Sequence, residues 1–412
     1  MGIGVGNFSV TPKMRTLVNE VLDSERISYG PMSQEFERQF AALHDCRFAV
    51  LSNSGTSSLQ VALAALKELH GWNDGDEVIV PALTFVASVN VVLHNRLTPV
   101  LVDVDPLYYG IDPILIERAI TPRTRAILPV HTFGQPCQMT AIMDVARRHN
   151  LDVVEDSCEC MFVKHALQKV GSFGDIGCFS TYAAHLLTTG VGGIATTNNI
   201  DYARIMRSLV NHGRDGIYIS IDDDDDVNQE TMREVISRRF NFERIGHSFR
   251  ITELEAALGL AQLDDWREII QKRQDNAAYL TRALFTNNAL QLPRVRADSQ
   301  HAFMMYPVVL RNLNKRGLIE HLESHGIETR DMLPLVNQPC YRGMWNPDDY
   351  PVAQWIERGG FYVGCHPNLT RDDLDTIIET IESYFNGLKT TRDNHALHGA
   401  RRSGVDRLPV PS

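Results

Sequence analysis

Apolar residues follow two alternating rhythms between residues 45 and 200 of the chain. Short runs rich in Val, Ile and Leu are followed by windows in which apolar residues recur every three or four positions. The runs predict strands with two apolar faces, and the windows predict amphipathic helices. Since such strands must be covered on both sides, the pattern indicates an α/β domain with a mostly parallel sheet. The expected strands are RFAVLSN, DEVIVPA, TPVLVDVDP, TRAILPV, LDVVEDS, IGCFSTY and GGIATTN.

The pattern changes after residue 200 and predicts a second, smaller domain. The stretch 252–284 is a long amphipathic window, which predicts one helix that bridges the two domains. Strand-like and helix-like windows follow, as in HAFMMYPVVLRN and RDDLDTIIETIESYFNGL, and indicate an α+β fold. We therefore expect a large domain over residues 1–265, a small domain over 266–388 and a flexible polar tail over 389–412.

The composition narrows the class of protein. The 412 residues carry a net charge of −11, which argues against binding to nucleic acids or anionic membranes because both need clustered positive charge. No run of about 18 apolar residues predicts a transmembrane helix, and the N-terminus lacks the pattern of a signal peptide. The seven scattered cysteines fit reduced thiols in a cytoplasmic enzyme. No metal site is expected, and the five consecutive aspartates at 222–226 predict a solvated loop.

Candidate chemistry lies where three of the expected strands end. The segment SNSGTSS, residues 52–58, precedes a helix, so its backbone N–H groups can bind an anion, or its hydroxyls can simply cap the helix. Asp156 can pair with a cation such as a pyridinium, or cap the next helix. Phe85 can stack on a flat ligand or pack in the core. Together, a phosphate site, a pyridine-facing carboxylate and a stacking ring match three faces of pyridoxal phosphate.

Motifs along nearly the whole chain carry a resemblance to a known family. In chain order they are YGPMSQEFERQFAAL, NSGTSSLQVAL, DEVIVPALTFVAS, VDVDP, PVHTFGQPCQM, VVEDSCE, GSFGDIGCFST, TTGVGG, NHGRDG, GHSFRITELEAALGLAQL, GIETR and NLTRDDLDTIIETI. The chain resembles the DegT/DnrJ/EryC1/StrS sugar aminotransferases. The resemblance implies the aspartate-aminotransferase-like α/β fold, type I of the pyridoxal 5′-phosphate (PLP) enzymes. It also implies PLP or pyridoxamine 5′-phosphate (PMP) as cofactor.

The same resemblance assigns roles to single residues. The residues expected to contact the cofactor are Gly55, Thr56, Ser57 and Ser180 at the phosphate, Phe85 on the ring face, Asp156 at the ring nitrogen, Glu159 near the ring hydroxyl, and Asn211. Asn211 resembles an asparagine that reaches the phosphate across a subunit boundary, so the resemblance implies a homodimer with a shared active site. Arg250 and Arg330 lie in segments that approach the substrate in the family.

A histidine occupies the position of the family's catalytic lysine. The family pattern Ser-Phe-x-x-x-Lys is replaced here by Ser180-Thr-Tyr-Ala-Ala-His185. No lysine lies between Lys169 and Lys272, and we expect Lys164 and Lys169 in a solvent turn, so that neither replaces the missing amine. A lysine bonds covalently to the cofactor aldehyde, whereas an imidazole acts as general acid and base without such a bond. We therefore expect a cofactor that is held non-covalently, with His185 as the catalytic residue.

Three functions are compatible with this exchange. The nucleotide-sugar 3-dehydratases of the family carry the same histidine, and resemblance to their colitose-pathway type implies dehydration at C3 of a nucleotide-linked 4-keto-6-deoxyhexose, with glutamate regenerating PMP. The iron–sulfur cluster of the ascarylose type is not expected, because no cysteine lies between Cys178 and Cys340. The alternatives are a nucleotide-sugar aminotransferase and a catalytically silent cofactor or sugar-nucleotide binding protein. Val191 and Ser248 depart from the family pattern and leave the substrate open.

Overall fold

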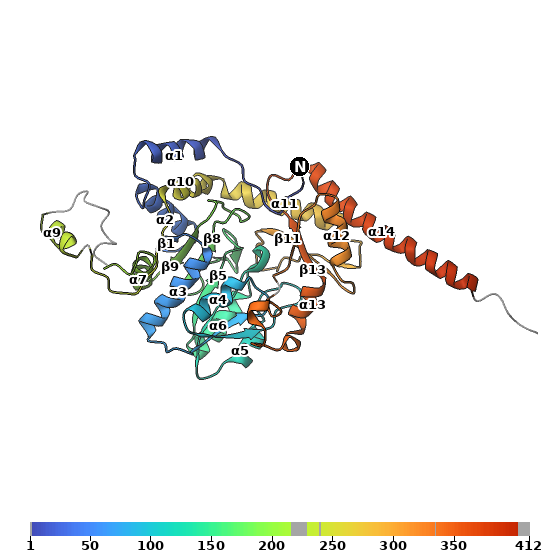
Figure 1. Cartoon of the computed structure of the whole chain (residues 1–412), viewed down its shortest axis with the longest axis horizontal. Helices are drawn as coiled ribbons and strands as arrows, with labels where there is room; N and C mark the ends of the chain where they lie inside the picture. The colour runs from blue at the N-terminus through green and yellow to red at the C-terminus, as the bar shows by residue number, and fades with distance from the viewer. Residues whose placement is uncertain (1, 216–228, 239, 334, 403–412) are drawn as a thin grey trace, which may run out of the picture.

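The centre of the molecule is a seven-stranded sheet in the order β1-β9-β8-β5-β4-β2-β3. The structure, a computed structural model, describes residues 2–215, 229–238, 240–333 and 335–402 (Figure 1). Neighbouring strands are parallel except for β9, which runs antiparallel to β1 and β8. The bounds are β1 (Phe48–Ser52), β2 (Glu77–Pro81), β3 (Thr98–Val102), β4 (Thr124–Ile127), β5 (Asp152–Asp156), β8 (Ile176–Ser180) and β9 (Gly193–Thr197). The predicted strands and the mostly parallel sheet are confirmed.

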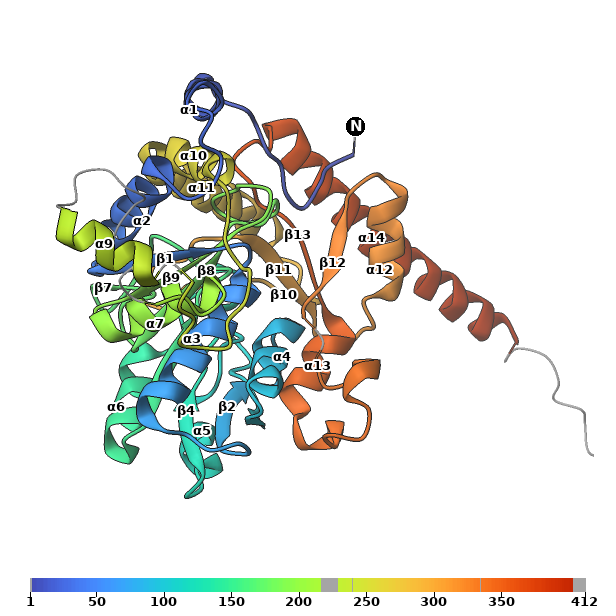
Figure 2. The ribbon, with the colours of Figure 1, turned by 60° about the vertical axis from the view of Figure 1, so that its left-hand side comes forward.

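Helices cover both faces of this sheet, as the two apolar faces of the strands require. Val78 and Val80 of β2 pack into one core, and Ile79 between them packs into another. The first core is completed by α3 (Gly55–His70), α4 (Val86–His94) and α7 (Ile200–Val210), and the second by α5 (Pro113–Ala119) and α6 (Met139–His149). Figure 2 shows these helices around the sheet. A third core joins β1, β8 and β9 to α2 (Pro31–Leu43) through Phe36 and Phe40.

The small domain is built on a four-stranded antiparallel sheet in the order β10-β11-β13-β12. The strands are β10 (Leu290–Gln291), β11 (Met305–Leu310), β12 (Thr329–Asp331) and β13 (Gly360–Gly364). Helices α12 (Arg316–Ser324) and α14 (Arg371–Arg402) pack on it through apolar residues such as Leu318 and Ile377. Helix α13 (Pro351–Gly359) instead packs toward the large domain through Ala353 and Ile356. The α+β fold of this part agrees with the sequence pattern.

The helix that we expected over residues 252–284 is in fact two helices. α10 (Glu253–Gln262) and α11 (Trp266–Leu284) are separated by a 3₁₀ turn at Leu263–Asp265. Asp264 and Asp265 form this turn, and aspartate is a poor residue for a helix interior because its side chain competes for backbone N–H groups. The apolar spacing continues across the turn and therefore does not reveal the break.

The first residues of the chain contact the small domain as well as the large domain that follows them. Ile3 forms a parallel bridge with Ile327, and its N–H donates to the Gly326 carbonyl at 2.8 Å. The Val5 N–H donates to the Glu328 carboxylate at 2.8 Å. We call residues 2–6 the N-terminal strap. The division of the chain at residue 265 stays a prediction. The N-terminal strap lies before this division in the chain but contacts residues 326–328 after it.

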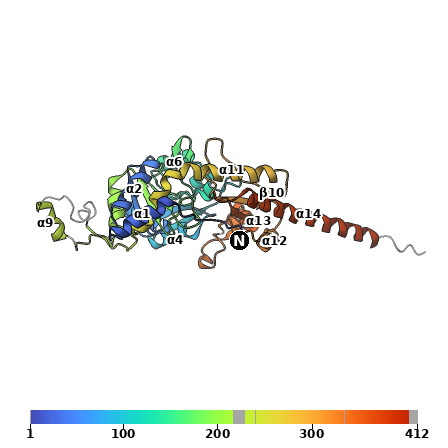
Figure 3. The same cartoon turned by 90° about the horizontal axis from the view of Figure 1, so that it is seen from above.

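Two helices lie at opposite ends of the molecule. Figures 1 and 3 show α9 (Gln229–Arg238) at one end and the C-terminal part of α14 at the other. α14 continues to Arg402, so residues 389–402 of the predicted tail extend a helix. The flexibility of residues 389–412 stays a prediction, and the aspartates at 222–226 lie outside the described residues. Among the described helices, none combines the length and apolar character needed to cross a membrane.

Candidate active site

The topology of the sheet brings three sequence-predicted positions to one edge. Ser52 and Ser180, the last residues of β1 and β8, both pair with Gly193 on the strand between them. Asp156, the last residue of β5, pairs with a residue of β8 close to its end. Because β1, β5 and β8 run in the same direction, their carboxyl ends meet at this edge, where α/β folds bind ligands. We call the loop 52–58 together with Asp156 and Ser180 the cofactor cradle.

Gly55 sits at the closest approach within the cofactor cradle. A Cβ at this position would lie 2.7 Å from Cys158 Sγ and 2.8 Å from Ser180 Cβ, so only glycine fits there. The three strand ends can therefore approach one another because residue 55 has no side chain. This is the physical reason for the glycine that the motif SNSGTSS contains.

The N-terminus of α3 presents donors on the open side of the cradle. Ser54 is the N-cap, and its hydroxyl accepts from the Ser57 N–H at 3.0 Å. The Ser57 hydroxyl donates to Asn53 Oδ1 at 2.6 Å, and Thr56 is exposed. The helix cap that we considered from the sequence is thus present. The remaining free N–H groups of the first turn and the dipole of a 16-residue helix also suit a phosphate, so both interpretations hold.

Asp156 is a buried carboxylate whose hydrogen-bond donors carry no charge. Its Oδ2 accepts from the Ser88 hydroxyl at 2.7 Å and its Oδ1 accepts from the Cys158 N–H at 3.2 Å. Burial raises the pKa of Asp156 even though both donors favour the charged form. A protonated pyridine nitrogen would supply the missing cation. Ser88, held by Thr84 at 2.7 Å, is a site residue that our sequence reasoning missed, although it lies three positions after Phe85.

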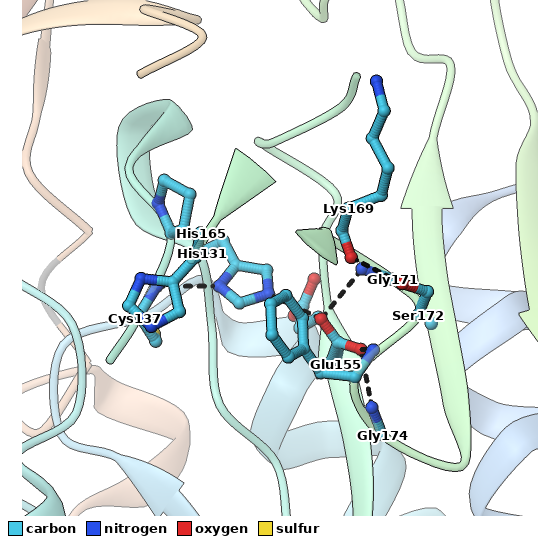
Figure 4. A network of polar contacts seen from close by, with 12 residues as sticks. His131, Cys137, Glu155, His165, Lys169, Gly171, Ser172 and Gly174 are labelled. Carbon is cyan, nitrogen blue, oxygen red and sulfur yellow. Dashed lines mark hydrogen bonds and ion pairs between the residues drawn. The ribbon is translucent and has the colours of Figure 1, made fainter. Parts of the chain in front are cut away.

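The neighbouring carboxylate, Glu155, points to the opposite side of β5 and is fully engaged. It accepts from the N–H groups of Gly171 (2.8 Å), Phe173 (2.7 Å) and Gly174 (2.8 Å), and lies 3.1 Å from His131 Nε2 (Figure 4). His131 Nδ1 in turn accepts from a backbone N–H at 3.0 Å, so Nε2 carries the proton and donates to Glu155. This network fixes the turn that leads into β8. It thereby holds the edge on which the cradle is built.

Phe85 is 59% exposed at the N-cap of α4, so its interpretation as a core residue is wrong. An exposed ring beside the strand ends suits stacking on a flat ligand. Glu159 is held on its Oε2 by the Phe133 N–H at 2.6 Å. Burial, with Asp156 as a further contribution, raises the pKa of Glu159 to about 7. Its carboxyl group therefore keeps part of its protons near neutral pH, where a glutamate side chain in water is fully ionised.

His185 lies in the loop 181–191 that follows β8, which we call the His185 loop. Its Nδ1 is 3.1 Å from the Ser180 carbonyl oxygen. A carbonyl only accepts, so Nδ1 carries the proton and Nε2 keeps its lone pair. Burial, opposed by this hydrogen bond and assisted by the charge of Arg273, lowers the pKa of His185 to about 4. The imidazole is therefore neutral at pH 7, with one nitrogen ready to accept a proton.

Of the remaining candidates, Asn211 and Arg250 belong to segments that are joined to the cradle, and Arg330 lies on the small sheet. The Asn211 side-chain oxygen is buried and has no hydrogen-bond partner among the described residues, and the Asn211 backbone forms a β-bridge with Ser248. Arg250 is exposed and contacts the Ser248 hydroxyl at 3.0 Å, and its neighbour Phe249 accepts from the Asn53 N–H at 2.6 Å. Arg330 lies on β12 of the small sheet, where it pairs with Glu328 and its Nη1 donates to the Thr329 carbonyl at 2.8 Å. The structure thus joins the segment of Arg250 to the cradle, and it pairs Arg330 on β12 with Tyr362 of β13.

The expectation that Lys169 lies in a solvent turn is wrong. It ends the hairpin of β6 (Lys164–His165) and β7 (Gln168–Lys169) and is only 9% exposed. Its amine donates to the Phe162 carbonyl at 3.0 Å and lies 4.7 Å from the ring centre of Trp266. The hairpin folds against α11, which the local sequence does not indicate. Because the amine is already bonded, Lys169 still does not replace the missing catalytic lysine.

The residues of the cradle fit PLP or PMP on three independent observations. A glycine leaves room at the helix N-terminus, a buried carboxylate has only neutral donors, and an exposed aromatic ring stands beside them. A mostly parallel sheet with these groups at its carboxyl edge defines a fold type I PLP enzyme. The chain belongs to the DegT/DnrJ/EryC1/StrS aminotransferase family, whose model matches residues 10–382.

Characterised relatives cover most of the chain. It is 36% identical over 374 residues to a GDP-perosamine synthase of Caulobacter vibrioides, which covers 89% of this chain and 94% of that protein. It is 31% identical to a dTDP-4-dehydro-2,6-dideoxy-D-glucose 3-dehydratase of Saccharopolyspora spinosa, over 87% of this chain and 81% of that one. The crystal structure of an aminotransferase from Psychrobacter cryohalolentis superposes with a TM-score of 0.82 at 29% identity, over 92% of this chain and 98% of that one.

These similarities confirm the family, the fold type and the PLP or PMP cofactor that the sequence predicted. The chain thus belongs to a family of PLP-dependent enzymes that includes sugar aminotransferases and sugar dehydratases. The similarities support amino transfer, which we considered as the alternative function, better than dehydration at C3. The family as a whole and the superposed structure are both described as aminotransferases.

Proposed function

We propose that this protein catalyses amino-group chemistry on a nucleotide-linked keto sugar, with the cofactor held non-covalently and His185 as the proton carrier. Transfer of the amino group to the sugar is the outcome that the relatives favour. The observation that carries the proposal is the imidazole of His185: Nδ1 is fixed on the Ser180 carbonyl, and Nε2 is left free as a base.

In this proposal the cradle binds and orients the cofactor, which when bound supplies an amine and a ring that withdraws electrons. The first turn of α3 holds the phosphate, with Gly55, Thr56 and Ser57 as in the family. Asp156 keeps the ring nitrogen protonated, and Ser88 fixes the carboxylate through its 2.7 Å hydrogen bond. The exposed ring of Phe85 covers one face.

His185 then moves the proton. As a neutral imidazole it accepts a proton at Nε2, and the hydrogen bond from Nδ1 to Ser180 stabilises the resulting positive charge. The low pKa of about 4 makes the imidazolium a strong acid, so the proton is readily returned to the substrate. The ring of Tyr182 lies edge-on to the imidazole, with the ring centres 6.0 Å apart.

Dehydration at C3 of a 4-keto-6-deoxyhexose is the second candidate. The specific observation in its favour is that the proton carrier is an imidazole and not a lysine amine. The imidazolium can protonate the departing hydroxyl oxygen, and the imidazole does not form the covalent bond to the cofactor aldehyde that a lysine forms. In both reactions glutamate is the proposed amine donor. We further propose a cytoplasmic homodimer in which Asn211 reaches the cradle of the second subunit.

A product assay separates the candidates. The protein is incubated with PMP, glutamate and a panel of 4-keto-6-deoxy sugar nucleotides, and the products are analysed by mass spectrometry together with released ammonia. An amino sugar without ammonia release supports amino transfer, and a 3-deoxy-4-keto sugar with one ammonia per turnover supports dehydration. Absence of turnover with every substrate, despite tight cofactor binding, would leave the silent binding protein. Borohydride treatment of the PLP complex is expected to label no lysine in the cradle.

A further inference from the structure

Arg273, on α11, is a buried cation directly behind the His185 loop. Its side chain is 3% exposed. Nη1 donates to the carbonyls of Phe303 (3.2 Å) and Met304 (2.8 Å), and Nη2 donates to the carbonyl of His185 itself (3.4 Å). Nε is buried without a partner. Within the described part of the chain no carboxylate forms an ion pair with this guanidinium.

A buried guanidinium without a counter-ion is costly to the folded state. Burial lowers the pKa of Arg273 to about 10, which measures how strongly the surroundings disfavour the charge. Backbone carbonyls compensate only part of this cost, since each offers a partial charge. A methionine or leucine would fill similar space at lower cost. The positive charge of Arg273 is therefore expected to serve a role other than stabilising the fold.

The position of Arg273 beside the His185 loop indicates what this role is. Its hydrogen bonds connect the His185 carbonyl to the carbonyls of Phe303 and Met304, which directly precede β11 of the small sheet. Its positive charge also disfavours a second cation on the nearby imidazole. Of the titratable groups packed around this position, Tyr182 faces the imidazole from the same loop, and Cys365 and His366 lie behind the guanidinium. Burial raises the pKa of Cys365 to about 12 and lowers the pKa of His366 to about 4, so neither of these two groups brings a negative charge at neutral pH.

We propose that Arg273 is a positioning residue for His185: its guanidinium holds the loop through the His185 carbonyl, and its charge disfavours a second cation on the imidazole. The proposal rests on the proposed catalytic role of His185, and no comparison assigns it. It also couples the acid–base group to the small domain, because the same guanidinium bonds residues on both sides.

Other contacts hold the His185 loop independently of this charge. The Gln262 side chain makes two hydrogen bonds to the backbone of Thr188, accepting from its N–H at 3.1 Å and donating to its carbonyl at 2.7 Å. Gly6 of the N-terminal strap packs against the loop on another side, with its α-carbon so close that a Cβ would lie 2.9 Å from Ala184 Cα. Removal of the Arg273 charge is therefore not expected to release the loop. Gln262 provides a matched control that loosens the loop without changing any charge.

The test is a titration of the His185 imidazole by NMR in the cofactor-free protein, assigned with His185→Asn. Arg273→Gln keeps amide donors for the carbonyls but removes the charge, and it is expected to raise the pKa of His185 measurably above about 4, while burial still holds it below its ordinary value. Arg273→Lys keeps the charge and is expected to leave that pKa near its wild-type value. Gln262→Ala should also leave it in place. Equal titration of His185 in all four proteins would overturn the proposal.

A kinetic measurement adds a second readout. The acid limb of the pH profile of kcat/KM is expected to shift to higher pH in Arg273→Gln by the same amount as the NMR titration, and not to shift in Arg273→Lys. A uniform loss of activity at every pH in both variants, with unchanged titration, would mean a purely structural role and would sink the proposal. Should Arg273→Gln fail to fold, as judged by circular dichroism, Arg273→Met takes its place as the uncharged variant. The titration needs no turnover, so a failure of the proposed reaction is distinguished from a failure of this inference.

Discussion

The cofactor cradle and the His185 loop lie side by side on the same strand end, yet they are held in different ways. The cradle is fixed by the sheet: its residues are the last residues of β1, β5 and β8 and the first turn of α3. The His185 loop is fixed from outside the sheet, by Gln262, Arg273 and the N-terminal strap. The cradle keeps the residues expected of a PLP enzyme, and the loop carries the exchange of lysine for histidine. The contrast separates binding of the cofactor from the chemistry done with it.

His185→Ala is expected to have the largest effect, because it separates turnover from cofactor binding. It removes the only proposed proton carrier and is expected to reduce kcat by about 10²–10⁴-fold. The cradle is untouched, so the affinity for PMP, measured by fluorescence titration, should stay within about twofold of wild type. A variant with unchanged kcat would show that another group moves the proton. His185→Lys tests the same position from the other side, and borohydride should then trap a lysine adduct.

Asp156→Asn acts on the cradle and should affect binding as well as turnover. The amide cannot pair with a protonated ring nitrogen, and we expect a loss of about a hundredfold in kcat/KM together with weaker cofactor binding. Ser88→Ala is the matched control, because it removes the 2.7 Å hydrogen bond to Asp156 but keeps the charge. Its effect should be about tenfold or less. If Asp156→Asn bound and turned over cofactor normally, the ring nitrogen would have another partner.

Gly6→Ala should disturb the loop without touching the cradle. The added Cβ would lie 2.9 Å from Ala184 Cα, next to His185, whereas the same change at Gly4 meets its nearest atom at 3.2 Å. We expect a loss of about tenfold in kcat for Gly6→Ala, since small displacements of an acid–base group are costly, and a smaller loss for Gly4→Ala. Cofactor affinity should be the same in both. Equal kcat in the two variants would show that the N-terminal strap does not position the loop.

The sequence predicts the cradle better than the loop, for a physical reason. Strand ends in a parallel sheet are encoded locally, by apolar runs that stop at residues such as Asp156 and Ser180, and the topology then brings them together. Arg273 and Gly6 act on His185 across 88 and 179 positions of the chain, and no local pattern marks such a contact. The burial of Lys169 was mispredicted for the same reason, because its hairpin packs on a distant tryptophan.

The break between α10 and α11 shows another limit. The apolar spacing runs through Leu263 into Trp266, and periodicity alone therefore favoured a single helix. The paired aspartates at 264–265 were the available signal, since aspartate prefers helix ends. The break matters for the site, because it sets the direction of α11 and hence the place of Arg273 behind the loop.

Glu159→Gln is expected to have the smallest effect on activity, and it tests a carboxyl group beside the cradle through stability. The folded pKa of about 7 lies above that of a model carboxyl, 4.5, so the folded state binds a proton more tightly than the unfolded state. The stability that Glu159 contributes is therefore fully present below pH 4.5 and is lost as the pH rises through 7. Urea unfolding at pH 5 and pH 8 should show that the glutamine variant gains up to about 2.5 kcal/mol relative to wild type at the higher pH. If the free energy of unfolding differed between variant and wild type by the same amount at both pH values, the pKa of Glu159 would lie in its ordinary range. Glu159 would then not be a group that titrates beside the cradle near neutral pH.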